Sequence, residues 1–295
     1  MSPNNPEPRF VDLQVNGHGG VDFLSANSTD EIRKAARSLY SSSVKSFLPT
    51  LITSDPLQLK ASALLIREVM NDRRSGESEI LGIHLEGPFI SHEKSGVHPQ
   101  KYIVEPNIAL MKEYLGIGSV RIVTLAPELR GALDLIKYLV DQNIVVSLGH
   151  SNATPDEANA GFDAGARTVT HLFNAMSKIP GLASAALDRD DVIIQMIVDD
   201  VHVDRAKVQI ALDKASERFI LTNDAVAPAG SGEGIHNFGE MKIQVKDGQA
   251  RHLDGTLAGG VGTLAKSLQI LAEMGVSYET ALASVTTRPL ALINQ

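Results

Sequence analysis

Five residues that can bind a metal ion or carry a proton stand where short apolar segments of the sequence end. They are Glu86 in HLEGP, His150 in GHS, His171 in THL, His202 in DDVH and Asp224 in TNDA. One carboxylate with two imidazoles is a common set of ligands for a catalytic zinc ion, which keeps a further position open for water. We therefore predict that Glu86, His150 and His171 bind one divalent metal ion.

The chemistry expected of such a site is hydrolysis. A metal ion lowers the pKa of a bound water towards about 7, so that hydroxide is available at neutral pH. Asp224 can accept the proton of that water and later pass it to a leaving amine. Zinc is the metal we expect first, and iron or manganese would accept the same ligands.

Each of these residues also has a purely structural interpretation. A single histidine at the end of a strand is more often a packing residue, and a glutamate before Gly-Pro is more often a solvated turn residue. The three together on alternating strands favour a metal site, because burying them unpaired would cost free energy. His84, two residues before Glu86 and on the same face of its strand, is expected to be a hydrogen-bonded core residue.

Eight short runs of apolar and β-branched residues alternate with helix-like patterns from Phe10 onward. Near-continuous runs of this kind are typical of strands buried on both faces of a parallel sheet. Their alternation with helices predicts an α/β fold, a (β/α)8 TIM barrel, whose chemistry lies where the strands end. The predicted strands are 10–15, 45–50, 79–85, 119–125, 143–149, 166–172, 192–198 and 218–223.

Capping signals mark helix starts, and one hairpin is predicted outside the barrel. Capping boxes of the type S/T-x-x-E begin predicted helices at Ser28 and Thr154. A hairpin insertion over 241–253 is predicted to turn at Asp247 and Gly248. This hairpin follows a glycine-rich loop and extends the last loop of the barrel.

The composition restricts the class of protein. The 295 residues include 27 basic and 35 acidic ones, and the net charge of −8 argues against a nucleic-acid partner. The 43% hydrophobic content supports a large core, and the absence of cysteine excludes disulfides and Cys-bound zinc. No apolar stretch of about 18 residues occurs, so we predict a cytoplasmic protein without a membrane partner. Residues 1–9 are predicted to be a disordered lead-in, and residues 10–295 a barrel domain.

Six motifs, in the order of the chain, carry a resemblance to a known family. They are HLEGPF, KSGVH, SLGHSNAT, THLFNAM, TNDAVAPAG and DGTLAGG, and the match extends from near Val11 to near Leu290. The sequence closely resembles the N-acetylglucosamine-6-phosphate deacetylase family of the amidohydrolase superfamily. The resemblance implies an amidohydrolase-type barrel that hydrolyses the acetamide of an amino-sugar phosphate and releases acetate.

The resemblance also implies roles for residues at the matching positions. It assigns Glu86, His150 and His171 to the metal and Asp224 to acid/base catalysis, in agreement with the pattern of residues. His98, which closes KSGVH, would polarise the acetyl carbonyl. The other implied substrate contacts are Val97 beside His98, Asn174, Ala175 and His202 for the sugar phosphate and its hydroxyls, and Leu257, Ala258 and Gly259 for the acetyl group.

Some positions depart from the family pattern. Gln14 and Asn16 replace an H-x-H pair that supplies a second metal site in many amidohydrolases, and amides bind transition metals poorly, so we predict one metal ion. Lys178 stands where the family has an arginine that reaches a substrate phosphate across a homodimer interface, and it would meet the phosphate as a point charge. Asp200 replaces a glycine and is expected to face solvent. The family's small β-sandwich is predicted to be absent.

Several functions remain open on the sequence alone. The leading prediction is deacetylation of N-acetylglucosamine 6-phosphate, a small-molecule amino-sugar phosphate. The same chemistry on N-acetylgalactosamine 6-phosphate differs by one hydroxyl contact. An unphosphorylated N-acetyl amino sugar is a further alternative because of Lys178. From another class comes a catalytically silent barrel, which would not need the ligand set together with Asp224.

Overall fold

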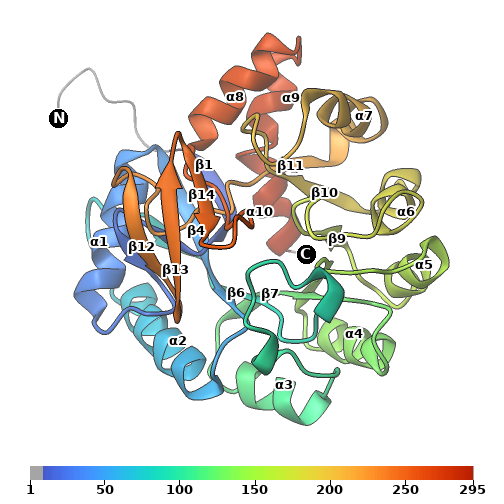
Figure 1. The fold of residues 1–295 in the computed structure, drawn as a ribbon, viewed down its shortest axis with the longest axis horizontal. Helices are drawn as coiled ribbons and strands as arrows, with labels where there is room; N and C mark the ends of the chain where they lie inside the picture. The colour runs from blue at the N-terminus through green and yellow to red at the C-terminus, as the bar shows by residue number, and fades with distance from the viewer. Residues whose placement is uncertain (1–8, 295) are drawn as a thin grey trace.

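Eight parallel strands form a barrel within residues 9–294, the part of the chain that the computed structural model describes (Figure 1). A bridge between Val15 and Ala225 joins the first strand to the segment after the last one and closes the ring. The predicted lead-in, apart from Arg9, lies outside the described residues. In order around the barrel the strands are β1 (Phe10–Val15), β4 (Val44–Ile52), β6 (Ile83–Glu86), β7 (Val120–Leu125), β8 (Val145–Leu148), β9 (Thr168–Val169), β10 (Ile193–Met196) and β11 (Phe219–Leu221).

Helices follow the strands and surround them, so the predicted (β/α)8 barrel is confirmed. The strands bury both faces, as their apolar runs require, because helices pack on the outside and strands face one another inside. The helices are α1 (Thr29–Ser41), α2 (Pro56–Asn71), α3 (Ile108–Leu115), α4 (Ala132–Asp141), α5 (Pro155–Asp163), α6 (Leu182–Asp188), α7 (Arg205–Ala215), α8 (Leu264–Glu273), α9 (Tyr278–Ala283) and α10 (Thr287–Ile293).

The third predicted strand is divided in two. A separate strand β5 (Glu79–Ile80) pairs with β4 before β6 begins. Gly82 separates the two strands with a φ of 143°. A Cβ at this position would lie 2.3 Å from Cγ of Arg121, so the close approach of the neighbouring strand requires glycine.

The two predicted capping boxes differ. At Thr154 the box is complete, since the side chain accepts from the N–H of Glu157 and the carboxylate of Glu157 accepts in return. At Ser28 only half of it forms: Ser28 accepts from the N–H of Glu31, but Glu31 accepts from the N–H of Asn27. The helix begins where predicted in both cases.

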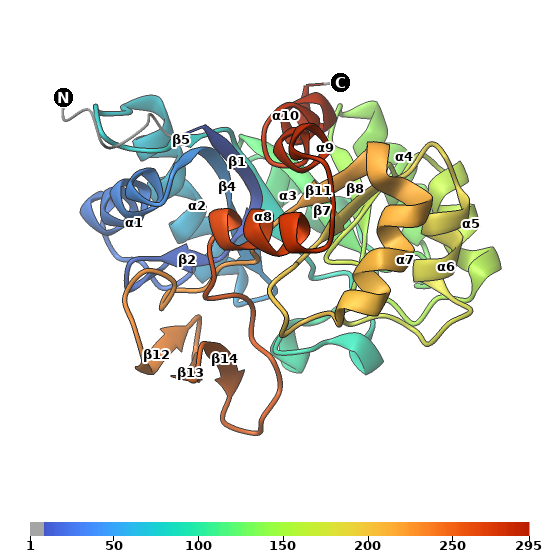
Figure 2. The same ribbon diagram turned by 90° about the horizontal axis from the view of Figure 1, so that it is seen from above.

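The insertion after β11 is a three-stranded sheet rather than a two-stranded hairpin. Strands β13 (Met241–Lys246) and β14 (Gln249–His252) turn at Asp247 and Gly248 as predicted, and β12 (Gly234–Phe238) adds a third, antiparallel strand. Figure 2 shows this sheet at one end of the barrel and α10 at the opposite end. A two-stranded pair, β2 (Gly17–His18) with β3 (Val21–Asp22), lies in the loop after β1. Residues 9–294 contain no β-sandwich beside the barrel.

The two ends of the barrel differ in polarity. An apolar cluster that includes Leu13, Leu48 and Ile122 packs against Leu292 and Ile293 of α10 and closes one end. Above this cluster the interior is polar. His84 is fully buried there and hydrogen-bonded, with its Nε2 2.7 Å from Oγ1 of Thr124, which confirms it as a core histidine. None of the described helices is long and apolar enough to cross a bilayer.

Candidate metal centre

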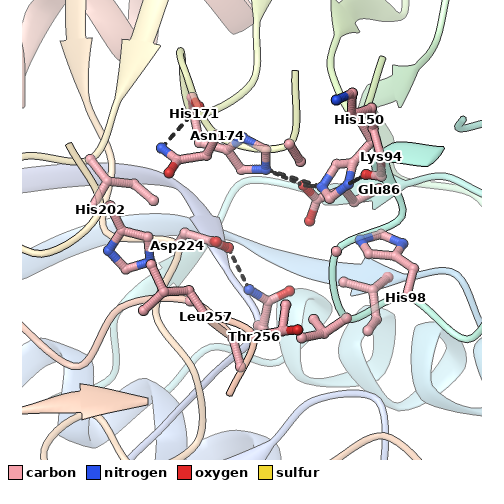
Figure 3. Close-up of a pocket in the computed structure, with 18 of the residues that line it drawn as sticks. Glu86, Lys94, His98, His150, His171, Asn174, His202, Asp224, Thr256 and Leu257 are labelled. Atoms are coloured by element: carbon pink, nitrogen blue, oxygen red, sulfur yellow. Dashed lines mark hydrogen bonds and ion pairs between the residues drawn. The ribbon is translucent and has the colours of Figure 1, made fainter. Parts of the chain in front are cut away.

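Glu86, His150 and His171 converge at the end of the barrel opposite α10. Glu86 is the last residue of β6, and the two histidines follow β8 and β9, which are neighbours in the sheet. Their ligand atoms lie within 4.8 Å of one another. Oε1 of Glu86 is 3.1 Å from Nε2 of each histidine, and the two Nε2 atoms are 3.1 Å apart (Figure 3).

The hydrogen bonds around this cluster leave lone pairs facing one another. Nδ1 of His150 lies 2.8 Å from the backbone oxygen of Lys94, which can only accept, so Nδ1 carries the proton. In the neutral ring, Nε2 then presents a lone pair to the carboxylate of Glu86 and to His171. Nδ1 of His171 is buried without a partner. Three buried electron-pair donors at this spacing fit a divalent cation, which agrees with the predicted ligand set.

The same charges shift the proton affinities of the cluster. Burial raises the pKa of Glu86, but hydrogen bonds and charge from the two histidines outweigh it and hold the pKa well below its usual value. Burial lowers the pKa of His171, yet the hydrogen bond and charge of Glu86 raise it overall. Both shifts show a carboxylate that attracts positive charge, which either protons or a metal ion can supply.

Gln14 and Asn16 of β1 and its following loop hold carboxylates in place. Nε2 of Gln14 donates to Oε1 of Glu86 at 3.0 Å, and Nδ2 of Asn16 donates to Oδ1 of Asp224 at 2.7 Å. Burial, followed by the charge of Glu86, raises the pKa of Asp224 to about 6. An acid whose pKa lies this close to neutrality can both accept and return a proton.

The predicted site residues His150, His171 and Asp224 have left-handed backbone conformations. The φ angles are 48° at His150, 33° at His171 and 49° at Asp224. Residues other than glycine adopt this region of backbone conformation only rarely. Here it turns the chain sharply after the strand ends. This turn projects the side chain across the mouth of the barrel. The residue types agree with this conformation, because histidine and aspartate adopt it more often than most other residues with a side chain.

A cavity of about 360 Å³ opens above the cluster. Eight of the predicted substrate contacts line it together with the ligand set and Asp224, and Lys178 does not, since its side chain is exposed on the loop before α6. The lining also includes Glu93 and Lys94, which the sequence interpretation did not single out although Lys94 begins the KSGVH motif. The predicted contacts that line the cavity are Val97, His98, Asn174, Ala175, His202, Leu257, Ala258 and Gly259.

His98 and His202 stand on different sides of the cavity and have different partners. Nδ1 of His98 lies 2.9 Å from Oγ1 of Thr53, and burial followed by the charge of His150 lowers the pKa of His98 well below its usual value. His98 is therefore a neutral imidazole that can hydrogen-bond a carbonyl. Nδ1 of His202 lies 2.7 Å from Oδ2 of Asp199, and its Nε2 is buried without a partner.

Neither Asp199 nor Asp200, which replaces the family's glycine, adds a free carboxylate to the cavity. Burial raises the pKa of Asp199, but the hydrogen bond with His202 outweighs it and lowers the pKa, so this carboxylate orients the imidazole. Asp200 turns away with a φ of 63° and forms a bidentate pair with Arg205 near the surface. The expectation that Asp200 faces solvent agrees with its exposed side chain.

The chain is similar to known deacetylases of amino-sugar phosphates. No family model matches the chain. The chain is 36% identical to N-acetylglucosamine-6-phosphate deacetylase of Caenorhabditis elegans, over 97% of this chain and 73% of that protein. It is 32% identical to N-acetylgalactosamine-6-phosphate deacetylase of Escherichia coli O157:H7, over 97% of this chain and 77% of that protein.

A solved structure shows the same barrel. The crystal structure of N-acetylglucosamine-6-phosphate deacetylase from Pasteurella multocida superposes with a TM-score of 0.91 at 33% identity, over 98% of this chain and 76% of that one. The fold, the cluster and the relatives together support a divalent metal ion as the cofactor. The resemblance seen in the sequence motifs is confirmed, and the chain belongs to the N-acetylglucosamine-6-phosphate deacetylase family of the amidohydrolase superfamily.

Proposed function

We propose that this protein hydrolyses N-acetylglucosamine 6-phosphate to glucosamine 6-phosphate and acetate. The observation that carries the proposal is the convergence of Glu86, His150 and His171 on one point, with Asp224 facing them across the same cavity. A silent barrel would have no physical reason to bury one carboxylate and two imidazoles in mutual contact beside an acid of raised pKa. The family relatives act on substrates of this class by name.

The site would hold one divalent cation, and zinc is the ion we propose for this nitrogen-rich set of ligands, with iron or manganese as alternatives. A bound divalent cation supplies a Lewis acid, which polarises a carbonyl and makes water more acidic. A second cation is not expected, because the amide nitrogens of Gln14 and Asn16 point at carboxylates and donate to them.

Asp224 would move the proton. Its carboxylate accepts a proton from the attacking water and returns it to the nitrogen of the sugar as the C–N bond breaks. Asn16 keeps Oδ1 occupied with a hydrogen bond, which leaves Oδ2 for this transfer. His98 would donate to the acetyl oxygen as negative charge develops there, and it is neutral before the reaction because burial disfavours its charged form.

The other lining residues would position the substrate. Leu257, Ala258 and Gly259 would form an apolar wall for the acetyl methyl group, and Val97 belongs to the same lining. Asn174, Ala175 and His202 also line the cavity and would meet the sugar hydroxyls and the phosphate. The unpartnered Nε2 of His202 is free to accept from a hydroxyl group.

A homodimer and a cytoplasmic location complete the proposal. Lys178 is exposed and does not line the cavity of its own chain, so a contact between Lys178 and phosphate would require the cavity of a second subunit. Sedimentation of the purified protein tests the dimer directly. A monomer at assay concentration would exclude a phosphate contact of Lys178 in trans.

Acetate release tests the function. The metal-loaded protein would be given N-acetylglucosamine 6-phosphate, N-acetylgalactosamine 6-phosphate and the two unphosphorylated sugars, with and without a chelator. We expect the highest kcat/KM for the first and loss of activity with the chelator. A preference for the galactosamine epimer would replace the substrate but keep the chemistry. No acetate from any of the four sugars would refute the proposal.

A further inference from the structure

The charges that line the cavity are unevenly distributed. Three carboxylates face it, those of Glu86, Glu93 and Asp224. Lys94 is the one lysine among the lining residues, and no arginine is present in that set within the described chain. With a divalent cation bound, its two positive charges cancel the negative charges of ionised Glu86 and Asp224. Glu93 and Lys94 then decide whether a dianionic phosphate meets a neutral or a negative cavity.

The backbone of Lys94 is fixed by the metal centre itself. Lys94 ends a short 3₁₀ helix, His92–Lys94, and its N–H donates to the oxygen of Ser91 at 3.0 Å. Its own oxygen accepts from Nδ1 of the ligand His150 at 2.8 Å. The base of this side chain therefore has a defined position beside the ligands, and Figure 3 shows Lys94 next to His150 in the cavity wall.

The ammonium group of Lys94 also has no competing partner. It forms no ion pair with any carboxylate of residues 9–294. Its neighbour Glu93 is exposed and accepts from Nδ2 of Asn152 at 2.6 Å, which engages that carboxylate elsewhere. A partly buried lysine at the edge of the cavity, without a carboxylate partner among the described residues, is available to bind an anion.

We propose that Lys94 binds the phosphate of the amino-sugar substrate within its own subunit. The inference rests on the proposed function for the identity of the substrate, and it differs from the expectation that Lys178 supplies this contact. Lys94 is then the residue that selects phosphorylated over plain N-acetyl amino sugars. Glu93 opposes it, because the negative charge of its carboxylate at the same wall repels the phosphate.

The test uses the metal-loaded 295-residue chain and two measurements. Calorimetry gives the affinity for glucosamine 6-phosphate and for glucosamine, and acetate release gives KM and kcat for the two N-acetylated forms. Lys94→Gln is expected to weaken binding of glucosamine 6-phosphate and raise KM for the phosphorylated substrate by about tenfold to hundredfold. Its effect on the plain sugars and on kcat should be small, and Lys94→Arg should restore most of the affinity.

Three further variants separate a phosphate contact from a structural role. Glu93→Gln should tighten binding of the phosphorylated sugar, a gain that a structural defect would not produce. Lys137→Gln removes the same charge from the exposed face of α4 and should change nothing. Lys178→Gln tests the competing contact. Equal losses for plain and phosphorylated sugars in Lys94→Gln would overturn the inference, as would a loss confined to Lys178→Gln.

The outcomes also distinguish this inference from the proposed function. If the wild-type protein releases acetate and Lys94→Gln binds glucosamine 6-phosphate normally, the inference about Lys94 is wrong and the function stands. If no sugar is deacetylated but glucosamine 6-phosphate binds and Lys94→Gln abolishes that binding, the function is wrong and Lys94 is a phosphate contact.

Discussion

Replacing Asp224 by asparagine tests the acid/base role with little change in structure. The asparagine oxygen can still accept from Nδ2 of Asn16, whose distance to Oδ1 of Asp224 is 2.7 Å, so the side chain should keep its place. Asp224 is not one of the three clustered ligands, so the metal should stay bound. Losing a group that transfers a proton typically costs about a hundredfold to ten-thousandfold in rate, equivalent to about 3–5 kcal/mol in the barrier.

The dependence of the rate on pH gives a second, independent readout. A base must be ionised, so kcat/KM should fall as the pH decreases through the pKa of Asp224. Burial and the charge of Glu86 raise that pKa to about 6, and a bound cation favours the carboxylate, so the acid limb should lie at or below about pH 6. Asp224→Asn should lack this limb.

The assay combines acetate release between pH 4.5 and about 8 with metal analysis of each protein. Asp141→Asn, an exposed change at the end of α4, is the control for loss of one carboxylate. Near-normal turnover of Asp224→Asn, or an acid limb unchanged in that variant, would remove Asp224 from proton transfer. Loss of metal together with activity would show that Asp224 contributes to metal binding instead.

Other perturbations of the site and the barrel have expected outcomes as well. His150→Ala or His171→Ala should release the metal, and unchanged metal content would exclude these ligands. A chelator should lower the melting temperature, because a ligand present at about 1,000 times its Kd stabilises the folded state by about 4 kcal/mol. Gly259→Ala should reduce turnover by displacing Asp224, since the added Cβ would lie 2.6 Å from the backbone oxygen of Asp224. Normal kinetics of this variant would show that the loop adapts. Burial raises the pKa of Asp12 from 3.8 to about 7, so its ionisation should reduce stability as the pH rises from about 4 to about 7. The measurement is denaturant unfolding of the metal-free proteins. Between pH 5 and pH 8, the free energy of unfolding of Asp12→Asn should rise relative to that of the wild type by roughly 2–3 kcal/mol.

The barrel could be predicted because its strands have an unusual local signature. Continuous apolar runs of four to eight residues are required where a strand is covered on both faces, and every predicted run overlaps an observed strand. The break at Gly82 and the third strand β12 were not predicted. Both depend on tertiary contacts, namely the approach of Arg121 and the pairing of an exposed, glycine-rich segment with β13.

The ligand set could be predicted because parallel strands bring their ends to one rim. Residues far apart in the sequence, such as Glu86 and His171, therefore become neighbours once the fold is known. The contacts made by loops could not be predicted in this way. Lys94 lies in a loop whose course depends on its hydrogen bond with His150, and Lys178 lies on the exposed loop before α6.

The left-handed residues explain why the loops matter to the metal centre. Such a conformation costs about 1–2 kcal/mol for a residue with a side chain, so the surrounding structure must hold it. At His150 the backbone oxygen accepts from the N–H of Ser91 at 2.9 Å, and at Asp224 it accepts from the N–H of Gly260 at 2.8 Å. The strain at a functional residue is therefore balanced by a bond from the loop that covers the site. A substitution in either loop should change metal affinity or proton transfer without touching a ligand, because the side chain and the strained backbone move as one unit.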